Sequence, residues 1–297
     1  MNIGVVGAGS IGLLLSARLA QRSHHIVCYV QREDQKRELN QWGIHLLPEK
    51  VRLPVQAKRT EQMTDHDLVI VSVKQPQIHP VIDVIKQTLS PDTPLLFLQN
   101  GMSHLEQVQR LKQPIWIGVV EHGAIRLNDH TVRHTGLGVI RAGTLRKQDQ
   151  HSMKNRLNML NDDRFPFVYE EDWERMVKQK LAVNAVINPL TALFRVKNGD
   201  IMLNSHIKKL GKHLCYEACD VLGLDRDTMW EMVVRIARAT SKNESSMLTD
   251  IEKGHETEID SISGYLLKSH ELDLPYTRFV YHAVKAIELK NQEEDDT

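Results

Sequence analysis

The amino-terminal glycine loop constrains the fold of this sequence more than any other feature. It follows the apolar run Ile3–Val6 and consists of Gly7, Ala8, Gly9, Ser10, Ile11 and Gly12. The next segment, Leu13–Gln21, is rich in leucine and alanine and predicts a helix. A G-x-G-x-x-G loop between a strand and a helix is typical of dinucleotide binding. Its glycines permit the tight turn, the approach of backbone to pyrophosphate and close helix–strand packing, and the helix N-terminus offers unpaired N–H groups to the phosphates.

Short apolar runs alternate with longer polar stretches through the first half of the chain. The strand-like runs are Ile3–Val6, Ile26–Val30, Leu68–Val73, Leu95–Leu98 and Ile115–Val120. The stretches between them are long enough for crossover helices, so the pattern predicts an α/β domain with a parallel sheet covered on both faces. A more β-rich stretch, His130–Gly143, follows, and its glycines predict a hairpin there.

The pattern changes near Phe165. From Asp172 onward, helix-length amphipathic segments dominate, separated by turn residues such as Gly223 and Gly254. We therefore predict two domains. A Rossmann-type dinucleotide-binding domain spans residues 1–165, and an all-helical domain spans residues 166–297.

The composition excludes several classes of protein. Lysine plus arginine and aspartate plus glutamate both total 38, so no net positive charge favours nucleic acid. No apolar run approaches the roughly 20 residues of a membrane span. The amino terminus lacks the basic and apolar regions of a signal peptide. The 3 cysteines form no C-x-x-C pair, and we assign no metal site. We expect a cytoplasmic protein that binds neither nucleic acid nor membrane.

The end of the second strand bears on the choice of cofactor. An NAD site usually carries an aspartate or glutamate there to hold the ribose 2′-hydroxyl, whereas this sequence reads Val30-Gln31-Arg32. Arg32 could pair bidentately with a 2′-phosphate, and Lys74 could add a second cation on the same rim. Either could instead be an ordinary surface charge, and the nearby Glu33-Asp34 keeps NAD open. Taken together, the two cations favour NADP.

The segment Asp172–Asn188 predicts an amphipathic helix whose apolar arc consists of Met176, Val177, Val183 and Ile187. Lys180 falls near the centre of this arc, and Asn184 and Asn188 follow it on one stripe. Desolvation would lower the lysine pKa from about 10.4 and suit it to protonate an alkoxide. The alternative is that its aliphatic stem only snorkels to water. Pro189 is expected to kink or end the helix.

Two groups further along the chain could contact a ligand. The adjacent hydroxyls of Ser245 and Ser246 could bind a carboxylate at a helix start, or could simply cap that helix. Glu258 borders the apolar face of the next predicted helix. Its carboxylate could accept a hydrogen bond from a substrate hydroxyl or orient Lys180, or it could be a plain surface charge.

These segments together resemble the ketopantoate reductase family. The likeness is carried by Gly7–Gly12, Leu98–Gly101, Lys180–Leu193 (KLAVNAVINPLTAL) and Ser245–Asp260 (SSMLTDIEKGHETEID), in the order typical of the family. The resemblance implies a Rossmann domain joined to a helical domain like that of 6-phosphogluconate dehydrogenase. It also implies NADPH-dependent reduction of ketopantoate to pantoate, in the synthesis of pantothenate and coenzyme A.

The resemblance also assigns roles to residues. Lys180 would be the general acid, and Glu258 an acid near the nicotinamide and the bound hydroxyl. The cofactor contacts would be Gly7, Ala8, Gly9, Ser10, Ile11, Gly12, Arg32, Lys74, Asn100, Ala124 and Glu258. The substrate contacts would be Asn100, Lys180, Asn184, Asn188, Asn198 and Ser246. A reductase of another small 2-oxo acid and a non-catalytic NADP-binding regulator are the alternatives, and the sequence leaves a homodimer open.

Overall fold

The chain of this computed structural model divides into two units, and residues 1–268 and 272–295 are described. The first unit comprises Met1–Gln99 and His104–Trp173. The second comprises Asn100–Ser103 and the residues from Glu174 onward. The chain therefore changes unit around residues 99–104 as well as after Trp173, whereas the sequence pattern suggested a single boundary near residue 165.

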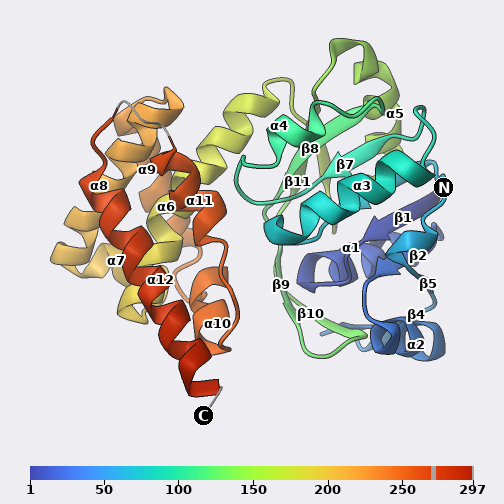
Figure 1. Ribbon diagram of the computed structural model, residues 1–297, viewed down its shortest axis with the longest axis horizontal. Helices are drawn as coiled ribbons and strands as arrows, with labels where there is room; N and C mark the ends of the chain where they lie inside the picture. Colours follow the sequence, from blue (N-terminus) through green and yellow to red (C-terminus); the bar gives the residue numbers. More distant parts are fainter. Residues whose placement is uncertain (269–271, 296–297) are drawn as a thin grey trace. The chain divides into compact units, whose positions relative to one another are not determined.

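An eight-stranded sheet forms the centre of the first unit (Figure 1). Its strands, in spatial order, are β12 (Phe167–Tyr169), β11 (Ile140–Thr144), β8 (Ile115–Val120), β7 (Leu95–Phe97), β6 (Leu68–Val71), β1 (Asn2–Val6), β2 (His25–Val30) and β5 (Gln56–Arg59). The six strands from β8 to β5 are parallel, as the alternating pattern predicted. The edge differs, because β11 runs antiparallel to β8 and parallel to β12.

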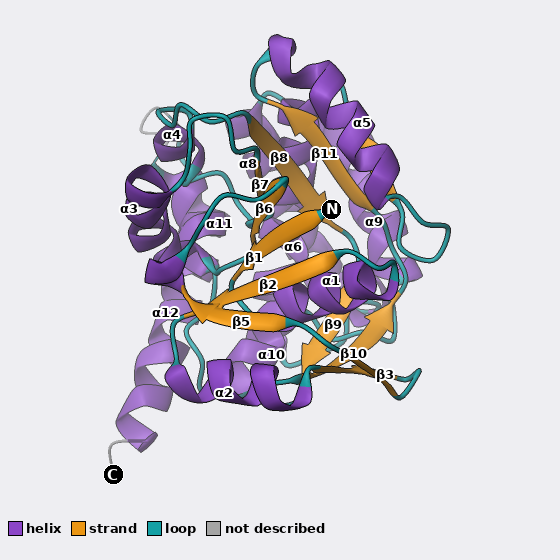
Figure 2. Ribbon diagram, turned by 90° about the vertical axis from the view of Figure 1, so that its right-hand side faces the viewer, coloured by secondary structure: helices purple, strands orange, loops and turns teal. Residues whose placement is uncertain are grey.

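Helices lie on both faces of this sheet. Figure 2 shows the strands between α3 on one side and α1 and α5 on the other. The helices of the unit are α1 (Ser10–Gln21), α2 (Glu33–Trp42), α3 (Ile78–Thr88), α4 (Leu105–Val108) and α5 (Gln150–Leu160). All four residues of β6 are buried, as are the last four of β1. A strand covered on both faces must be apolar at every position, which explains why these runs are continuous rather than alternating.

A second, four-stranded sheet corrects the predicted hairpin at His130–Gly143. Its spatial order is β4 (Val51–Leu53), β3 (Ile44–Leu47), β10 (Thr131–Gly136) and β9 (Gly123–Arg126). β10 pairs antiparallel with β9 and parallel with β3, while β11 belongs to the large sheet. The hairpin is therefore β9–β10. The stretch 137–139 carries the chain from one sheet to the other rather than reversing it.

The second unit is helical and is drawn in yellow to red in Figure 1, apart from its short segment 100–103. Its helices are α6 (Trp173–Phe194), α7 (Asp200–Leu203), α8 (Ser205–Leu222), α9 (Arg226–Ala239), α10 (Ser246–Glu252), α11 (Ile259–Leu267) and α12 (Pro275–Asp295). Among the described helices, none is both long and apolar enough to cross a membrane.

Helix α6 continues through Pro189 rather than ending there. Proline removes one backbone hydrogen bond and costs about 3 kcal/mol in a helix interior. Packing offsets this cost, because Leu190 is 1% exposed and Val186 is fully buried. Gly211 of α8 comes close to both of these side chains, at 3.3 Å from each when measured from the position a Cβ would take. Tertiary contacts thus hold the helix on both sides of the proline.

Candidate functional site

The glycine loop lies where the order of the large sheet reverses. β1 pairs with β2 on one side and with β6 on the other, so the chain leaves β1 toward one half of the sheet and returns to build the other half. At such a switch point the connections diverge at the carboxyl ends of the strands and leave a crevice, which is where open α/β sheets bind ligands. The loop lies between β1 and α1, as the sequence predicted, and the sheet order places it at this crevice.

Two glycines of the loop are required by the protein itself. Gly7 has φ +94°, and a Cβ there would lie 2.7 Å from Val73 Cγ1. A Cβ on Gly12 would lie 1.8 Å from the carbonyl oxygen of Gly7, so a side chain would force α1 away from the loop. Ser72 holds this arrangement from the neighbouring strand, because its hydroxyl donates to the Gly7 carbonyl at 3.0 Å. These contacts account for the first and third glycines by packing alone.

Gly9 differs, because nothing in the protein demands a glycine there. Its φ is −77°, and a Cβ built on it would meet no atom within 4 Å. Gly9 caps α1, whose first turn carries no acidic residue. An exposed backbone at the positive end of a 12-residue helix fits a bound pyrophosphate, which a side chain at this position would obstruct. The loop therefore has the shape and the polarity expected of a dinucleotide site.

The two predicted cations flank this loop. Arg32 follows β2 and Lys74 follows β6, so both lie at the carboxyl edge of the sheet, on opposite sides of β1. Both residues are exposed. The two acids that left NAD open, Glu33 and Asp34, are paired along α2. Glu33 lies 2.9 Å from Lys36, and Asp34 forms an ion pair with Arg37. Their carboxylates are therefore engaged on the surface of their own helix.

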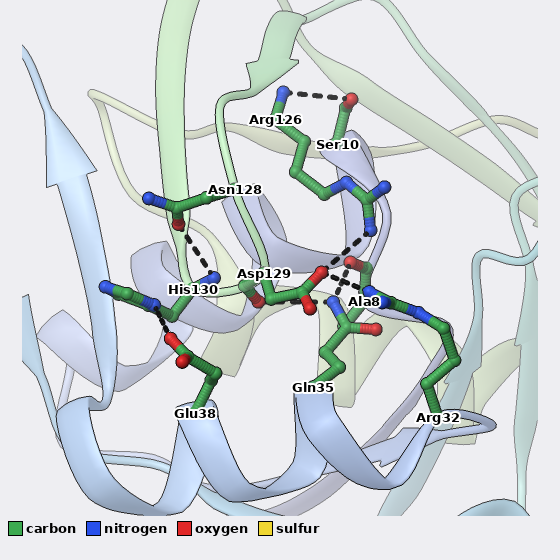
Figure 3. A network of polar contacts seen from close by, with 9 residues as sticks. All are labelled: Ala8, Ser10, Arg32, Gln35, Glu38, Arg126, Asn128, Asp129 and His130. Carbon is green, nitrogen blue, oxygen red and sulfur yellow. Dashed lines mark hydrogen bonds and ion pairs between the residues drawn. The ribbon is translucent and has the colours of Figure 1, made fainter.

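The turn before β10 contacts the glycine loop at Ala8 and Ser10 (Figure 3). The hydroxyl of Ser10 accepts a hydrogen bond of 3.2 Å from the backbone N–H of Arg126. The side-chain amide of Gln35 donates to the Ala8 carbonyl at 2.9 Å and to the Asp129 carbonyl at 3.2 Å. The Asp129 carboxylate in turn pairs with the Arg32 guanidinium (Figure 3). The glycine loop is thus contacted by a segment that lies more than 100 residues further along the chain.

A buried histidine pair includes His134 of β10, the strand that follows this turn. Arg18 Nη2 is 2.6 Å from Glu49 Oε1 and 2.7 Å from His134 Nδ1, and His134 Nε2 is 3.1 Å from His122 Nδ1. Gly138 N–H donates to the same His122 nitrogen at 3.1 Å. Since Arg18 can only donate, the network assigns neutral rings to both histidines. Burial, together with the neighbouring His134 ring and the positive charge of Arg18, lowers the pKa of His122 to about 4. His122 is two residues from Ala124, the predicted backbone contact, which is half-buried in β9.

Within the helical unit, α6 presents the predicted lysine face. The apolar arc is buried as expected, at Met176, Val177, Val183 and Ile187. Lys180 and Asn184 are half-buried, and Asn188 is 7% exposed. Lys178 is half-buried as well, but it forms an ion pair of 2.7 Å with Glu174 one turn away. The helix therefore separates its two lysines, with Lys180 on the stripe that carries the asparagines.

Of the two adjacent serines, Ser245 contacts α6 through a buried hydroxyl. Thr191 Oγ1 is 2.6 Å from Ser245 Oγ, and it also donates to the Asn188 carbonyl at 3.0 Å. Ser245 caps α10, because its Oγ accepts the Leu248 N–H at 3.0 Å. The capping interpretation is thus confirmed for Ser245. Ser246 occupies the first turn of the same helix and is exposed. The contact holds the start of α10 against α6 near Asn188.

Asn100 and Glu258 are brought together directly. Asn100 Nδ2 donates to Glu258 Oε2 at 2.9 Å, and both side chains are half-buried. Asn198 has a different setting. Its side-chain nitrogen donates to Thr240 Oγ1 at 3.0 Å, and its backbone N–H donates to the Asn243 carbonyl at 3.0 Å. It therefore ties the turn before α7 to the end of α9.

The comparison with family models decides the classification. The model described as "Ketopantoate reductase PanE/ApbA" matches residues 3–147, and that described as "Ketopantoate reductase PanE/ApbA C terminal" matches residues 172–288. The chain belongs to the ketopantoate reductase family.

Individual members of the ketopantoate reductase family are similar to this chain over nearly its whole length. The chain is 38% identical to 2-dehydropantoate 2-reductase of Bacillus subtilis, over 97% of this chain and 98% of that protein. It is 33% identical to the protein of the same name from Listeria innocua, over 97% of each. The crystal structure of the probable 2-dehydropantoate 2-reductase from Bacillus subtilis has a TM-score of 0.86 and covers 97% of this chain and 100% of that one.

The fold is also shared with a protein of lower sequence identity. D-mandelate dehydrogenase, solved as a ternary structure with NADH and anilino(oxo)acetate, has a TM-score of 0.92 at 21% identity and covers 98% of this chain and 100% of that one. At that identity the likeness shows a shared fold. The comparisons and the structure agree on a Rossmann-type α/β unit followed by a helical unit.

Sequence patterns missed one part of the site. Gln35, Arg126 and Asp129 contact the glycine loop or Arg32, but no local motif links them to it. The only signal was the turn-forming pair Asn128-Asp129 in the stretch before β10. Their position depends on the pairing of β10 with β9 and β3, which the predicted hairpin had wrong.

Proposed function

We propose that this chain reduces 2-dehydropantoate to pantoate with NADPH. The observation that carries the proposal is the 38% identity to 2-dehydropantoate 2-reductase of Bacillus subtilis over nearly the full length of both chains. The glycine loop at the switch point supports the cofactor half of the proposal. The lysine–asparagine stripe on α6 supports the chemical half.

The first unit would hold the cofactor. The open backbone at Gly9 and the N-terminus of α1 suit the pyrophosphate, while Arg32 and Lys74 suit the 2′-phosphate. Asn100 and the backbone around Ala124 are the remaining proposed contacts. When bound, NADPH supplies the hydride. The contribution of the protein is to orient the reactants and to place charge and protons.

Lys180 is the proposed proton donor. Addition of hydride to the ketone carbon leaves the two carbonyl π electrons on oxygen, and the alkoxide so formed takes a proton from Lys180 Nζ. The amine left behind regains its proton from solvent. Positioned proton transfer of this kind contributes roughly 10²–10⁴ in rate. Half-burial of Lys180 on the same stripe as Asn184 supports this role.

The remaining polar groups of the helical unit suit a small hydroxylated acid. Ser246 in the first turn of α10 is proposed to bind the substrate carboxylate, together with Asn184, Asn188 and Asn198. Glu258 is proposed to accept a hydrogen bond from the substrate hydroxyl. The bond from Asn100 already fixes one oxygen of that carboxylate, which supports a defined orientation for the other.

The fold alone does not select the substrate. The D-mandelate dehydrogenase structure, with anilino(oxo)acetate bound, shares this architecture at a TM-score of 0.92, so an enzyme for another 2-oxo acid is the competing proposal. A difference of one methylene in a pocket is worth only about 1–3 kcal/mol. Substrate choice within the class therefore needs measurement.

The decisive experiment compares oxidation of NADPH and NADH by the purified protein across a panel of 2-oxo acids. The panel contains ketopantoate, benzoylformate, 2-oxoisovalerate and pyruvate. We expect the highest kcat/KM for ketopantoate with NADPH. A higher value for another member would transfer the assignment to that acid. Absence of turnover with every member and either cofactor would favour a non-catalytic NADP-binding protein.

We also propose that the protein acts as a homodimer. A solved relative from Staphylococcus aureus, 22% identical with a TM-score of 0.80, is described as a dimeric ketopantoate reductase. Light scattering on the purified chain would test this, and a mass near 34.1 kDa, that of one chain, would contradict it.

A further inference from the structure

We propose that Asp129 is an internal anion that occupies Arg32 in place of the 2′-phosphate, and that Arg126 receives the Asp129 carboxylate when that phosphate binds. The inference rests on the proposed function, because it takes NADPH as the cofactor. It assigns roles to two residues outside the glycine loop. Asp129 would set the affinity for the phosphorylated cofactor, and Arg126 would act as a positioning residue through Asp129.

The geometry of the three side chains carries the inference. The Asp129 carboxylate pairs with the Arg32 guanidinium, and the same oxygen, Oδ1, lies 3.6 Å from Arg126 Nη1 (Figure 3). One carboxylate oxygen is thus shared by two guanidinium groups at different distances. Because an incoming phosphate would use the same donors of Arg32, the carboxylate and the phosphate cannot both hold that guanidinium fully.

The exposure of the three side chains fits an exchange of partners. Asp129 is 23% exposed, whereas Arg32 and Arg126 are 55% and 38% exposed. The two guanidinium groups can therefore turn at the surface, while the carboxylate sits on a more fixed support. A small shift of Asp129 toward Arg126 would free Arg32 and would leave the carboxylate neutralised rather than facing the phosphate unpaired.

The turn that carries Asp129 is held by contacts that do not involve its carboxylate. Gln35, which is 5% exposed, binds the Asp129 carbonyl as well as the Ala8 carbonyl of the glycine loop. Ser10 binds the backbone N–H of Arg126 at 3.2 Å. His130 Nδ1 lies 2.7 Å from Glu38 Oε2 on α2. An Asp129→Asn variant should therefore keep the turn in place and remove only the negative charge.

The charge balance gives the direction of the effect. The two arginines and the aspartate together carry one net positive charge, and removing the carboxylate charge raises this to two. A 2′-phosphate carries close to two negative charges, so the carboxylate opposes its binding both by competing for Arg32 and by repulsion. For groups a few ångströms apart at a protein surface, these effects are worth about tenfold in affinity.

The test measures binding of 2′,5′-ADP and of 5′-AMP by isothermal titration calorimetry. These probes carry and lack the 2′-phosphate, and neither can undergo hydride transfer. The variants are Asp129→Asn, Arg126→Gln and the double variant, with Asp34→Asn as the matched control. Asp34 is an exposed acid two residues after Arg32 in the sequence, and it pairs with Arg37 instead.

We expect Asp129→Asn to lower the Kd for 2′,5′-ADP about tenfold and the Kd for 5′-AMP less than twofold. Arg126→Gln should raise the Kd for 2′,5′-ADP severalfold, because the Asp129 carboxylate then stays on Arg32. In the double variant this loss should disappear, since Arg126 acts through Asp129. The Asp34→Asn control should change either Kd by less than twofold.

Two results would overturn the inference. One is weaker binding of 2′,5′-ADP by Asp129→Asn, which would mean that the carboxylate orients the arginines for the phosphate. The other is that Arg126→Gln weakens binding of 2′,5′-ADP equally in the unaltered chain and in the Asp129→Asn variant. This would mean that Arg126 binds the phosphate itself. In either case turnover of ketopantoate with NADPH by the unaltered chain would leave the proposed function standing. Failure of the unaltered chain to bind 2′,5′-ADP or to oxidise NADPH would instead remove the function on which the inference rests.

Discussion

The side-chain amide of Asn100 donates a 2.9 Å hydrogen bond to the carboxylate of Glu258, a residue 158 positions further along the chain. The adjoining Gly101 approaches the same helix closely, because a Cβ there would lie 2.4 Å from the Ser261 carbonyl oxygen. The segment 100–103 is thereby fixed to the start of α11. The bond couples a proposed cofactor contact to the proposed acid of the site.

This coupling predicts non-additive effects on stability. Asn100→Ala and Glu258→Ala should each destabilise the protein. The double variant should lose about 1.5 kcal/mol less than the sum of the two, the lower end of the range for a hydrogen bond to a charged group. Urea unfolding of the four proteins measures this. Glu258→Gln, which keeps an acceptor oxygen, should retain most of the stability. A coupling indistinguishable from zero would mean that the bond contributes nothing to folding.

The glycine loop predicts a contrast between two alanine variants. Gly12→Ala places a Cβ 1.8 Å from the Gly7 carbonyl, so it should lower Tm by several degrees. Gly9→Ala meets no protein atom within 4 Å, so it should lower Tm less than Gly12→Ala does, by no more than the loss of a glycine N-cap, while losing affinity for NADPH at least tenfold. Differential scanning calorimetry and NADPH fluorescence titration separate the two effects. Unchanged NADPH affinity in a stable Gly9→Ala protein would mean that no ligand approaches the loop at this residue.

Lys180 and Lys178 provide a matched pair for the proposed proton transfer. Lys180→Ala should lower kcat for ketopantoate reduction by roughly 10²–10⁴ while leaving the Kd for NADPH within about threefold. Lys178 pairs with Glu174 on the surface of the same helix, so Lys178→Ala should leave kcat within about twofold. Steady-state kinetics with both variants tests this, and equal losses of kcat would argue against a specific role for Lys180.

The buried histidine pair predicts loss of stability in acid. Burial, together with His134 and Arg18, lowers the pKa of His122 from 6.5 to about 4. The unfolded chain therefore binds a proton at this ring more readily than the folded chain does. Stability should rise with pH between about 4 and 6.5, and it should fall by about 2 kcal/mol as the pH drops from 6.5 to 5.

Urea unfolding between pH 7.5 and 5 would measure this loss. A His122→Phe variant should show a shallower dependence on pH, because the phenyl ring cannot titrate and can keep the stacking on Phe165, whose centroid is 4.1 Å from that of His122. His282→Gln, which changes an exposed histidine, should keep the original dependence. Identical slopes for all three proteins would assign the acid sensitivity to other groups.

The parts of the fold that were predictable from the sequence rest on local patterns. The parallel strands and the glycine loop were recognisable because burial on both faces demands continuous apolar runs and because the turn demands glycine. The apolar arc of α6 was recognisable for the same reason, since a helix repeats its faces every 3.6 residues. Each of these signals lies within about 20 neighbouring residues.

The parts that were not predictable depend on distant partners. The glycines around His130–Gly143 suggested a hairpin, but β10 pairs with β3, whose residues lie some 85 positions earlier, and the next strand joins the other sheet. Pro189 suggested a kink or the end of a helix, but α6 continues past it because Leu190 is buried against α8. Asp129 reaches Arg32 only through this long-range pairing, so its role was invisible in the sequence.

The short excursion of the chain at 100–103 has a consequence for protein engineering. Because these four residues belong with the helices rather than with the strands on either side of them, the two units cannot be exchanged between homologues by a single splice after Trp173. In a chimaera made that way, α11 would come from one homologue and Asn100-Gly101 from the other. The segment 100–103 would therefore have to be exchanged together with the helices to keep the polar contact and the close backbone approach.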